Sequence, residues 1–235
     1  EITDRIVRGQ FEPDCTKVIN ALVAAEDNCF DIGGHYGYFT FLLAGLARRG
    51  RVDTFEPVSA HVNRLNQGVH ASGLDHVTIH HCGVADRSGV MRLNFAESDG
   101  DDSMAYLQDV GGVASEAADE HYASFSSTEV DVVTLDSLDL PAPGFIKIDA
   151  EGAEGAILAG GRELIQSHRP RMLVEVHGVR EAFQVMRVLC ECDYHAYAVT
   201  EQQTTMPLLL VHREDDEAVR RVQETLDRDI EALWA

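Results

Sequence analysis

The chain has 235 residues, a length that suits one α/β domain with an ample core. Its 40 acidic residues against 19 basic ones give a formal charge of −21, which disfavours nucleic acid and an anionic membrane surface as partners. The sequence has no signal peptide and no apolar run of about 18 residues, so we expect a cytoplasmic protein with no membrane partner.

Two further features describe its setting. The sequence begins at Glu1 without a methionine, so we expect a trimmed chain or part of a larger biosynthetic protein. Its five cysteines include no C-x-x-C pair, and an odd number argues against a disulfide framework.

The first predicted elements are a helix and a strand that runs into glycines. Apolar residues at helical spacing predict a covering helix over 12–26, within an N-terminal segment 1–28. A short apolar strand follows over 29–33, and three glycines come within six residues of Asp31, before a helix over about 39–49. Such a turn is typical of a nucleotide site, because glycine lets the backbone pass close to a ligand.

The spacing of these glycines separates two ligand classes. A dinucleotide site needs glycine at the first, third and sixth positions, but counted from Gly33 the third and sixth residues are His35 and Tyr38. The order Asp-x-Gly-x-x-x-Gly, formed by Asp31, Gly33 and Gly37, instead resembles motif I of S-adenosylmethionine methyltransferases. The alternative is a glycine-rich turn that binds no ligand.

The next strand, over 51–57, ends on an acid. Glu56 lies 19 residues after Gly37, about where this architecture places a carboxylate that binds a ribose diol. A carboxylate can accept hydrogen bonds from both hydroxyls. The alternative is an acid that caps the helix beginning near Pro57.

A third strand and an insertion follow. The strand is predicted over 77–82, and the loop 83–86 after it is expected to hold adenine. Strands over 90–95 and 129–135 then flank an acidic segment, 96–128, which is either a substrate cap or a mobile insertion.

Two later strands end in functional side chains. A buried strand over 145–149 leads into a turn and a helix, with carboxylates at Asp149, Glu151 and Glu154, at the edge of the sheet where ligands bind in open α/β folds. On the strand 171–177, Glu175 and His177 are two residues apart and so share one face.

The end of the chain is predicted as a hairpin and a helix. Strands about 194–200 and 208–212 form an antiparallel pair. An apolar stripe predicts a last helix from about 216 to 234, within the segment 214–235.

The motifs together resemble the FkbM-type methyltransferase family. F-D-I-G-G-H-Y-G-Y-F-T, T-F-E-P, V-V-T-L-D-S-L, F-I-K-I-D-A-E-G-A-E and L-V-E-V-H match its pattern in order, over about residues 29–177. The resemblance implies a single domain over 1–235 with a class I, Rossmann-like α/β fold: a mostly parallel seven-stranded sheet with an antiparallel C-terminal edge hairpin and a small inserted segment. It also implies methyl transfer from S-adenosylmethionine to a hydroxyl of a sugar, polyketide or related natural product.

The family motif places cofactor binding on Asp31, Gly33, Gly37 and Glu56. Two residues depart from the family pattern, since Gly34 stands where alanine is usual and His35 where asparagine is usual. The other residues that we expect at the cofactor are Gly34, His35, Thr40, Gly83, Val84 and Asp149.

The proposed chemistry requires a base, because an aliphatic hydroxyl must lose its proton as the methyl group arrives. Histidine, with a pKa of about 6.5, is neutral at pH 7, and a positioned general base contributes roughly 10²–10⁴-fold. We predict His177 as this base, held in one tautomer and stabilised as imidazolium by Glu151, or by Glu175 as a substitute, with Asp149 as the third catalytic residue. The alternative is a hydrogen-bonded structural histidine.

Two other interpretations stay open. Asp149, Glu151, Glu175 and His177 could instead bind Mg²⁺, which would hold a diol and lower its pKa; we do not favour this, because the sequence places the acids close together but does not show that they converge. The chain could also be a non-catalytic cofactor-binding or scaffold domain. The methyl acceptor, a small or carrier-bound hydroxylated molecule, is not identified by the sequence.

Overall fold

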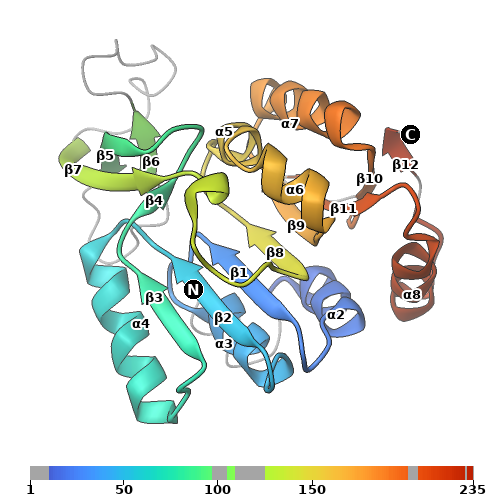
Figure 1. Cartoon of the computed structure of the whole chain (residues 1–235), viewed down its shortest axis with the longest axis horizontal. Coiled ribbons are helices and arrows are strands. Elements are labelled where there is room, and N and C mark those ends of the chain that lie inside the picture. Colours follow the sequence, from blue (N-terminus) through green and yellow to red (C-terminus); the bar gives the residue numbers. More distant parts are fainter. Residues whose placement is uncertain (1–10, 97–104, 109–124, 201–205, 231, 235) are drawn as a thin grey trace.

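An eight-stranded sheet forms the centre of the molecule (Figure 1). The structure is a computed structural model that describes residues 11–96, 105–108, 125–200, 206–230 and 232–234. The strands lie in the order β12-β10-β11-β9-β8-β1-β2-β3. Their bounds are β1 Asn28–Ile32, β2 Arg51–Phe55, β3 Val77–His80, β8 Phe145–Ile148, β9 Arg171–Val176, β10 Tyr194–Ala198, β11 Met206–His212 and β12 Ala232–Trp234.

The sheet is mostly parallel, as predicted. Strands β3, β2, β1, β8 and β9 all run in one direction, and β11 is antiparallel to both β9 and β10. Every residue of β8 is buried, which explains its nearly continuous apolar sequence: a parallel strand is covered by helices on both faces. The fold class and the antiparallel edge hairpin are therefore confirmed, with one strand more than the seven expected.

Helices cover both faces of this sheet. On one face α2 (Pro13–Leu22), α3 (Tyr38–Leu46) and α8 (Asp216–Leu226) share a core cluster, and Val69 of α4 (Ser59–Ser72) packs against it. On the other face α5 (Glu154–Ala159), α6 (Arg162–His168) and α7 (Val179–Cys192) share a second cluster. None of the helices in the described part of the chain is long and apolar enough to cross a membrane.

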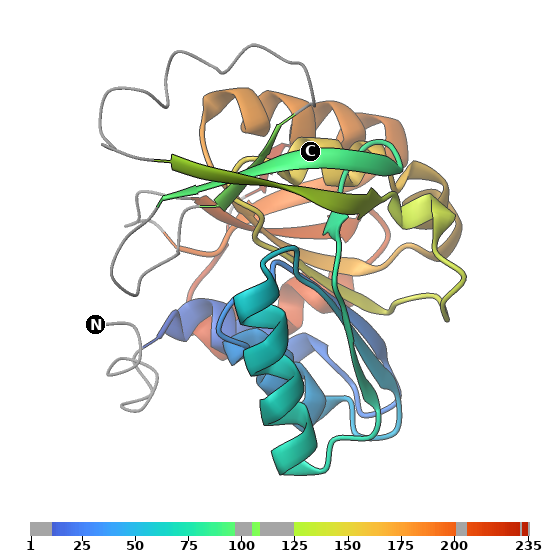
Figure 2. The same ribbon diagram turned by 90° about the vertical axis from the view of Figure 1, so that its left-hand side faces the viewer.

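A second, smaller sheet follows β3 (Figure 2). Its order is β4-β7-β5-β6, with bounds β4 Gly83–Val84, β5 Gly89–Ala96, β6 Ala105–Gln108 and β7 Phe125–Val133. Residues 83 and 84 were predicted as a loop and are a strand, because they pair with Val132 and Val133 of β7. The acidic segment 96–128 lies mostly outside the described residues, and its described parts belong to this sheet.

The predicted last helix is wrong beyond Leu226. Asp227 takes a left-handed conformation, with φ 53°, that ends α8. The chain then turns into β12, which pairs with β10. The apolar stripe continued past this point because Ile230 packs into the core from outside any helix.

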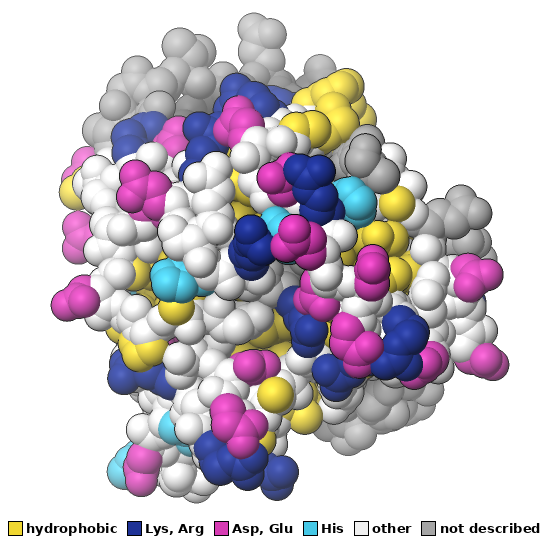
Figure 3. All heavy atoms as spheres, turned by 45° about the vertical axis from the view of Figure 1, so that its right-hand side comes forward, with side chains coloured by type: hydrophobic (Ala, Val, Ile, Leu, Met, Phe, Trp, Pro, Cys, Tyr) yellow, Lys and Arg dark blue, Asp and Glu magenta, His cyan; other side chains and the backbone are white. Residues whose placement is uncertain are grey.

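Charged side chains of both signs are interspersed on the face seen in Figure 3. The net charge of −21 is therefore not the result of a surface that lacks basic residues. The exclusion of nucleic acid stays a prediction.

Candidate active site

The candidate site lies where the chain changes direction within the sheet. From β1 the chain builds β2 and β3 on one side, and β8 and β9 lie on the other. Ligands in open α/β sheets bind at the carboxyl ends of the strands at such a switch point. The glycine turn after β1, Glu56 after β2, Asp149 after β8 and His177 after β9 all lie at this edge.

The glycine turn is packed tightly between its neighbours. Gly33 and Gly37 have φ of 86° and 91°, a region that residues with a Cβ rarely adopt. A Cβ on Gly33 would lie 1.8 Å from the carbonyl oxygen of Asp149, and one on Gly37 would lie 2.7 Å from Leu65 Cδ2. The glycines are thus required by the packing of the turn, which brings the loops after β1 and β8 into contact.

Glu56 links the glycine turn to the next helix. It is 4% exposed; Oε2 accepts a hydrogen bond from the His35 backbone N–H at 2.8 Å, and Oε1 accepts one from the Val58 N–H at 2.8 Å. Val58 is the residue just before α4 begins at Ser59, so Glu56 fixes the approach to the helix and does not cap its first turn. A ribose would use the remaining lone pairs of the same oxygens, so its binding stays a prediction.

Asp31 and Thr40 lie beneath the turn. Thr40 is fully buried, and its hydroxyl donates to Asp31 Oδ2 at 2.6 Å. Burial raises the pKa of Asp31 to about 6, although Lys147 and the bond from Thr40 act in the opposite direction. Both residues were predicted at the cofactor, and the structure places them where they support the turn.

Asp31→Asn is expected to remove a pH dependence of stability. The pKa of Asp31 is about 6 in the folded chain against an ordinary value of 3.8, so the folded chain holds this proton more strongly. The free energy of unfolding of the wild type should therefore fall as the pH rises from about 4 to about 6, by up to about 3 kcal/mol from this group. Urea unfolding of both proteins without cofactor, over this range, measures the difference. Parallel curves for the two would contradict the assignment.

The remaining predicted cofactor residues are not all brought to the turn. His35 is half-buried, with its ring 4.6 Å from that of His61. Gly34 is buried beside Thr54. Gly83 and Val84 are buried in β4, with Val84 2% exposed, so the structure does not present them on an open surface.

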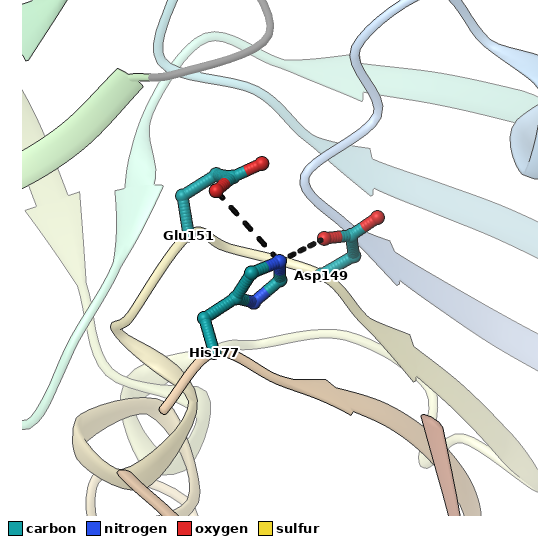
Figure 4. A group of neighbouring side chains, drawn as sticks. All are labelled: Asp149, Glu151 and His177. Atoms are coloured by element: carbon teal, nitrogen blue, oxygen red, sulfur yellow. Dashed lines mark ion pairs between the residues drawn. The ribbon is translucent and has the colours of Figure 1, made fainter. Parts of the chain in front are cut away.

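Three predicted catalytic side chains converge (Figure 4). Asp149 and Glu151 come from the turn after β8, where Glu151 has a left-handed φ of 46°, and His177 comes from the end of β9. His177 Nε2 lies 3.8 Å from Asp149 Oδ1 and 3.7 Å from Glu151 Oε2. The side chain of His177 is 16% exposed, so the cluster reaches the surface.

The residue that holds the imidazole is Glu154. Its Oε1 lies 2.9 Å from His177 Nδ1 and accepts a bond from the Gly152 N–H at 3.0 Å. Glu154 is fully buried in the first turn of α5. Glu151, predicted to fix the tautomer, faces the other nitrogen, so that part of the prediction was wrong; its charge does stabilise the imidazolium, as predicted. Glu175 acts on the cluster through its charge, which raises the pKa of Glu151.

The charges of the cluster favour a protonated imidazole. Burial lowers the pKa of His177, but the bond to Glu154 and the charges of Glu151, Glu154 and Asp149 outweigh it and raise the pKa to about 9. Burial raises the pKa of Glu151 to about 7. The expectation that His177 is neutral at pH 7 is therefore wrong, since these charges favour the protonated imidazole.

Sequence reasoning missed Lys147. Its side chain is 3% exposed, Nζ lies 2.8 Å from Asp149 Oδ2 and 4.6 Å from the centre of the Phe39 ring, and the residue is the register partner of Asp31. A signal was present: a lysine inside a buried strand needs a partner, and residues 147 and 149 share a face.

The fold is that of the class I S-adenosylmethionine-dependent methyltransferases. The chain belongs to the FkbM methyltransferase family, because the family model of the methyltransferase FkbM domain matches residues 31–196. This confirms the resemblance seen in the sequence. Comparison with curated proteins gave no match.

Solved structures of low sequence identity share the fold. Methyltransferase FkbM from Methylobacillus flagellatus KT has a TM-score of 0.59 at 18% identity, covering 80% of this chain and 44% of that one. A SAM-dependent O-methyltransferase from Thermotoga maritima has 0.53 at 12%, covering 90% and 71%. A putative methyltransferase from Streptococcus mutans in complex with SAH has 0.52 at 10%, covering 84% and 94%. The chain thus spans less than half the length of the first of these proteins.

Proposed function

We propose that this chain transfers the methyl group of S-adenosylmethionine to a hydroxyl oxygen of a sugar, polyketide or related natural product, free or bound to a carrier. The observation that supports this is the contact between the glycine turn and the turn that carries the cluster, at Gly33 and Asp149. A donor seated on the glycine turn would have its methyl group beside Asp149 and Glu151 of the turn after β8 and beside His177 at the end of β9.

The reaction needs alignment and a proton acceptor. The acceptor oxygen attacks the methyl carbon, the carbon–sulfur bond breaks, and S-adenosylhomocysteine leaves. Alignment alone can contribute of order 7–11 kcal/mol in favourable systems. His177 in its neutral form is the proposed base: Glu154 fixes Nδ1–H, so Nε2 is left to take the hydroxyl proton.

Mass spectrometry with a panel of hydroxylated acceptors tests this function. Methylated product in the presence of S-adenosylmethionine, with release of S-adenosylhomocysteine, is the expected result. A chain that binds the donor calorimetrically and methylates none of the alcohols, sugars or polyketides would be a cofactor-binding domain.

Glu56→Gln is expected to weaken S-adenosylmethionine binding. A hydrogen bond to a charged acceptor is worth about 1.5–3 kcal/mol, which corresponds to about 10–100-fold in the dissociation constant. Isothermal titration of wild type and variant measures it. Glu129→Gln, an exposed acid on β7, removes the same charge away from the site and should bind like the wild type. Equal affinity of all three proteins would remove Glu56 from the cofactor site.

A further inference from the structure

We infer that Asp149, Glu151 and His177 form a binding site for one divalent cation of the Mg²⁺ or Mn²⁺ class. The role given to the cation below rests on the proposed function, whereas its binding does not. Carboxylate oxygens with one imidazole nitrogen are a donor set that such ions accept.

The spacing of the three side chains fits an ion better than a bonded network. A hydrogen bond from Nε2 to a carboxylate oxygen spans about 2.7–3.2 Å, whereas the two distances here are 3.7 and 3.8 Å. The three ligand atoms lie within 4.8 Å of one another. Ligands at about 2.1 Å from Mg²⁺ are separated by about 3–4 Å, so a small rotation of Glu151, whose side chain is 35% exposed, completes the site.

His177 and Asp149 are each oriented by a second side chain, at the atom that faces away from the proposed ion. Glu154 is hydrogen-bonded to His177 at Nδ1, which directs the lone pair of Nε2 toward the carboxylates, and Lys147 binds Oδ2 of Asp149, which leaves Oδ1 toward the same point. Ligating histidines almost always donate their other N–H to a carboxylate or carbonyl in this way. Glu154 and Lys147 thus orient His177 and Asp149, the side chains that would contact the ion.

The balance of charge also favours a dication. Asp149, Glu151 and Glu154 surround the site, and the one lysine that contacts them within the described residues, Lys147, also lies within the charge field of Asp31 and Glu12. A divalent cation would offset part of this excess of carboxylates. Moreover, Glu154 is fully buried, and its Oε2 has no hydrogen-bond partner among the described residues, so the negative charge is incompletely compensated within the chain.

A cation here would change the part taken by His177. Nε2 can hold either a proton or a metal ion, so a cation makes His177 a ligand and ends its role as base. The cation would hold the acceptor hydroxyl and lower its pKa, and the hydroxyl proton would pass to water as the oxygen takes the methyl group.

Mn²⁺ binding to the chelator-treated full chain tests the site. Electron paramagnetic resonance should show one tightly bound Mn²⁺ per chain, with nitrogen modulation from the imidazole. Glu151→Gln and His177→Gln should each weaken binding at least about tenfold, since loss of an outer partner alone costs about 10–100-fold. The nitrogen signal should disappear only in His177→Gln. Glu129→Gln, with the same loss of charge on β7, should bind as the wild type does.

The same samples separate this inference from the proposed function. Equal Mn²⁺ affinity of all variants, or bound Mn²⁺ without nitrogen modulation, would overturn the cation site. Full methyl transfer in the presence of a chelator would overturn its catalytic role and leave His177 as the base. Site-specific Mn²⁺ binding without methylation of the acceptor panel would instead refute the proposed function.

Discussion

Assayed with a chelator present, so that Nε2 of His177 holds no metal ion, His177→Gln is expected to lower the rate of methyl transfer by roughly 10²–10⁴-fold, the contribution of a positioned general base. Glutamine keeps a polar side chain of similar length at this half-buried position, but its amide is not basic and cannot take up the hydroxyl proton. Since the interaction is made as the proton leaves, kcat and kcat/KM should fall by the same factor. Steady-state kinetics with a saturating donor measures both.

Two comparisons make this result interpretable. His70→Gln changes an exposed histidine at the end of α4 and should leave turnover unchanged. The affinity of His177→Gln for S-adenosylmethionine should equal that of the wild type, because His177 is not among the residues predicted to bind the cofactor. Turnover of the variant within a factor of about 3 of the wild type would dismiss His177 from the chemistry.

Glu154 explains why the site could be predicted only in part. Strand periodicity and the rule that parallel strands end at one edge are enough to bring Asp149 and His177 together. They do not fix the order of contacts after the strand, where Glu151 takes a left-handed conformation and turns toward Nε2. Because the next turn begins α5, Glu154 comes under the imidazole and takes Nδ1. That exchange of roles depends on the backbone of this turn, where Gly152 also has a positive φ, of 95°.

The fold was predictable for a related reason. Buried parallel strands and amphipathic helices have periods that a sequence displays, so β1, β2, β8 and β9 were found to within a residue or two. Short strands that form by pairing with a distant segment leave no periodic pattern in the sequence. The two-residue strand β4 forms because β7 lies beside it, and β12 forms because it pairs with β10. Such strands are decided by tertiary contacts, which override local propensity.

Lys147→Met is expected to destabilise the chain by about 3–5 kcal/mol, the cost of breaking a buried ion pair from one side. Burial disfavours the charge on Lys147, but the charges of Asp149, Asp31 and Glu12 outweigh it and raise its pKa above the ordinary value. Methionine retains the length of the side chain and its packing on Phe39. What it removes is the only neutralising contact made to Asp149 Oδ2 by a lysine or arginine within the described residues.

Urea unfolding measures this loss, with the slope of the transition expected to stay constant because the surface exposed on unfolding is the same. Lys17→Met is the matched control: its side chain is 52% exposed, and its pairing with Asp14 should be worth at most about 1 kcal/mol. Adding Asp31→Asn to Lys147→Met should restore part of the stability, since it removes one of the three carboxylates left without the charge of Lys147. If the single variant loses less than about 1 kcal/mol, Lys147 does not balance the charges beneath the site, and the excess of carboxylates no longer supports the cation site.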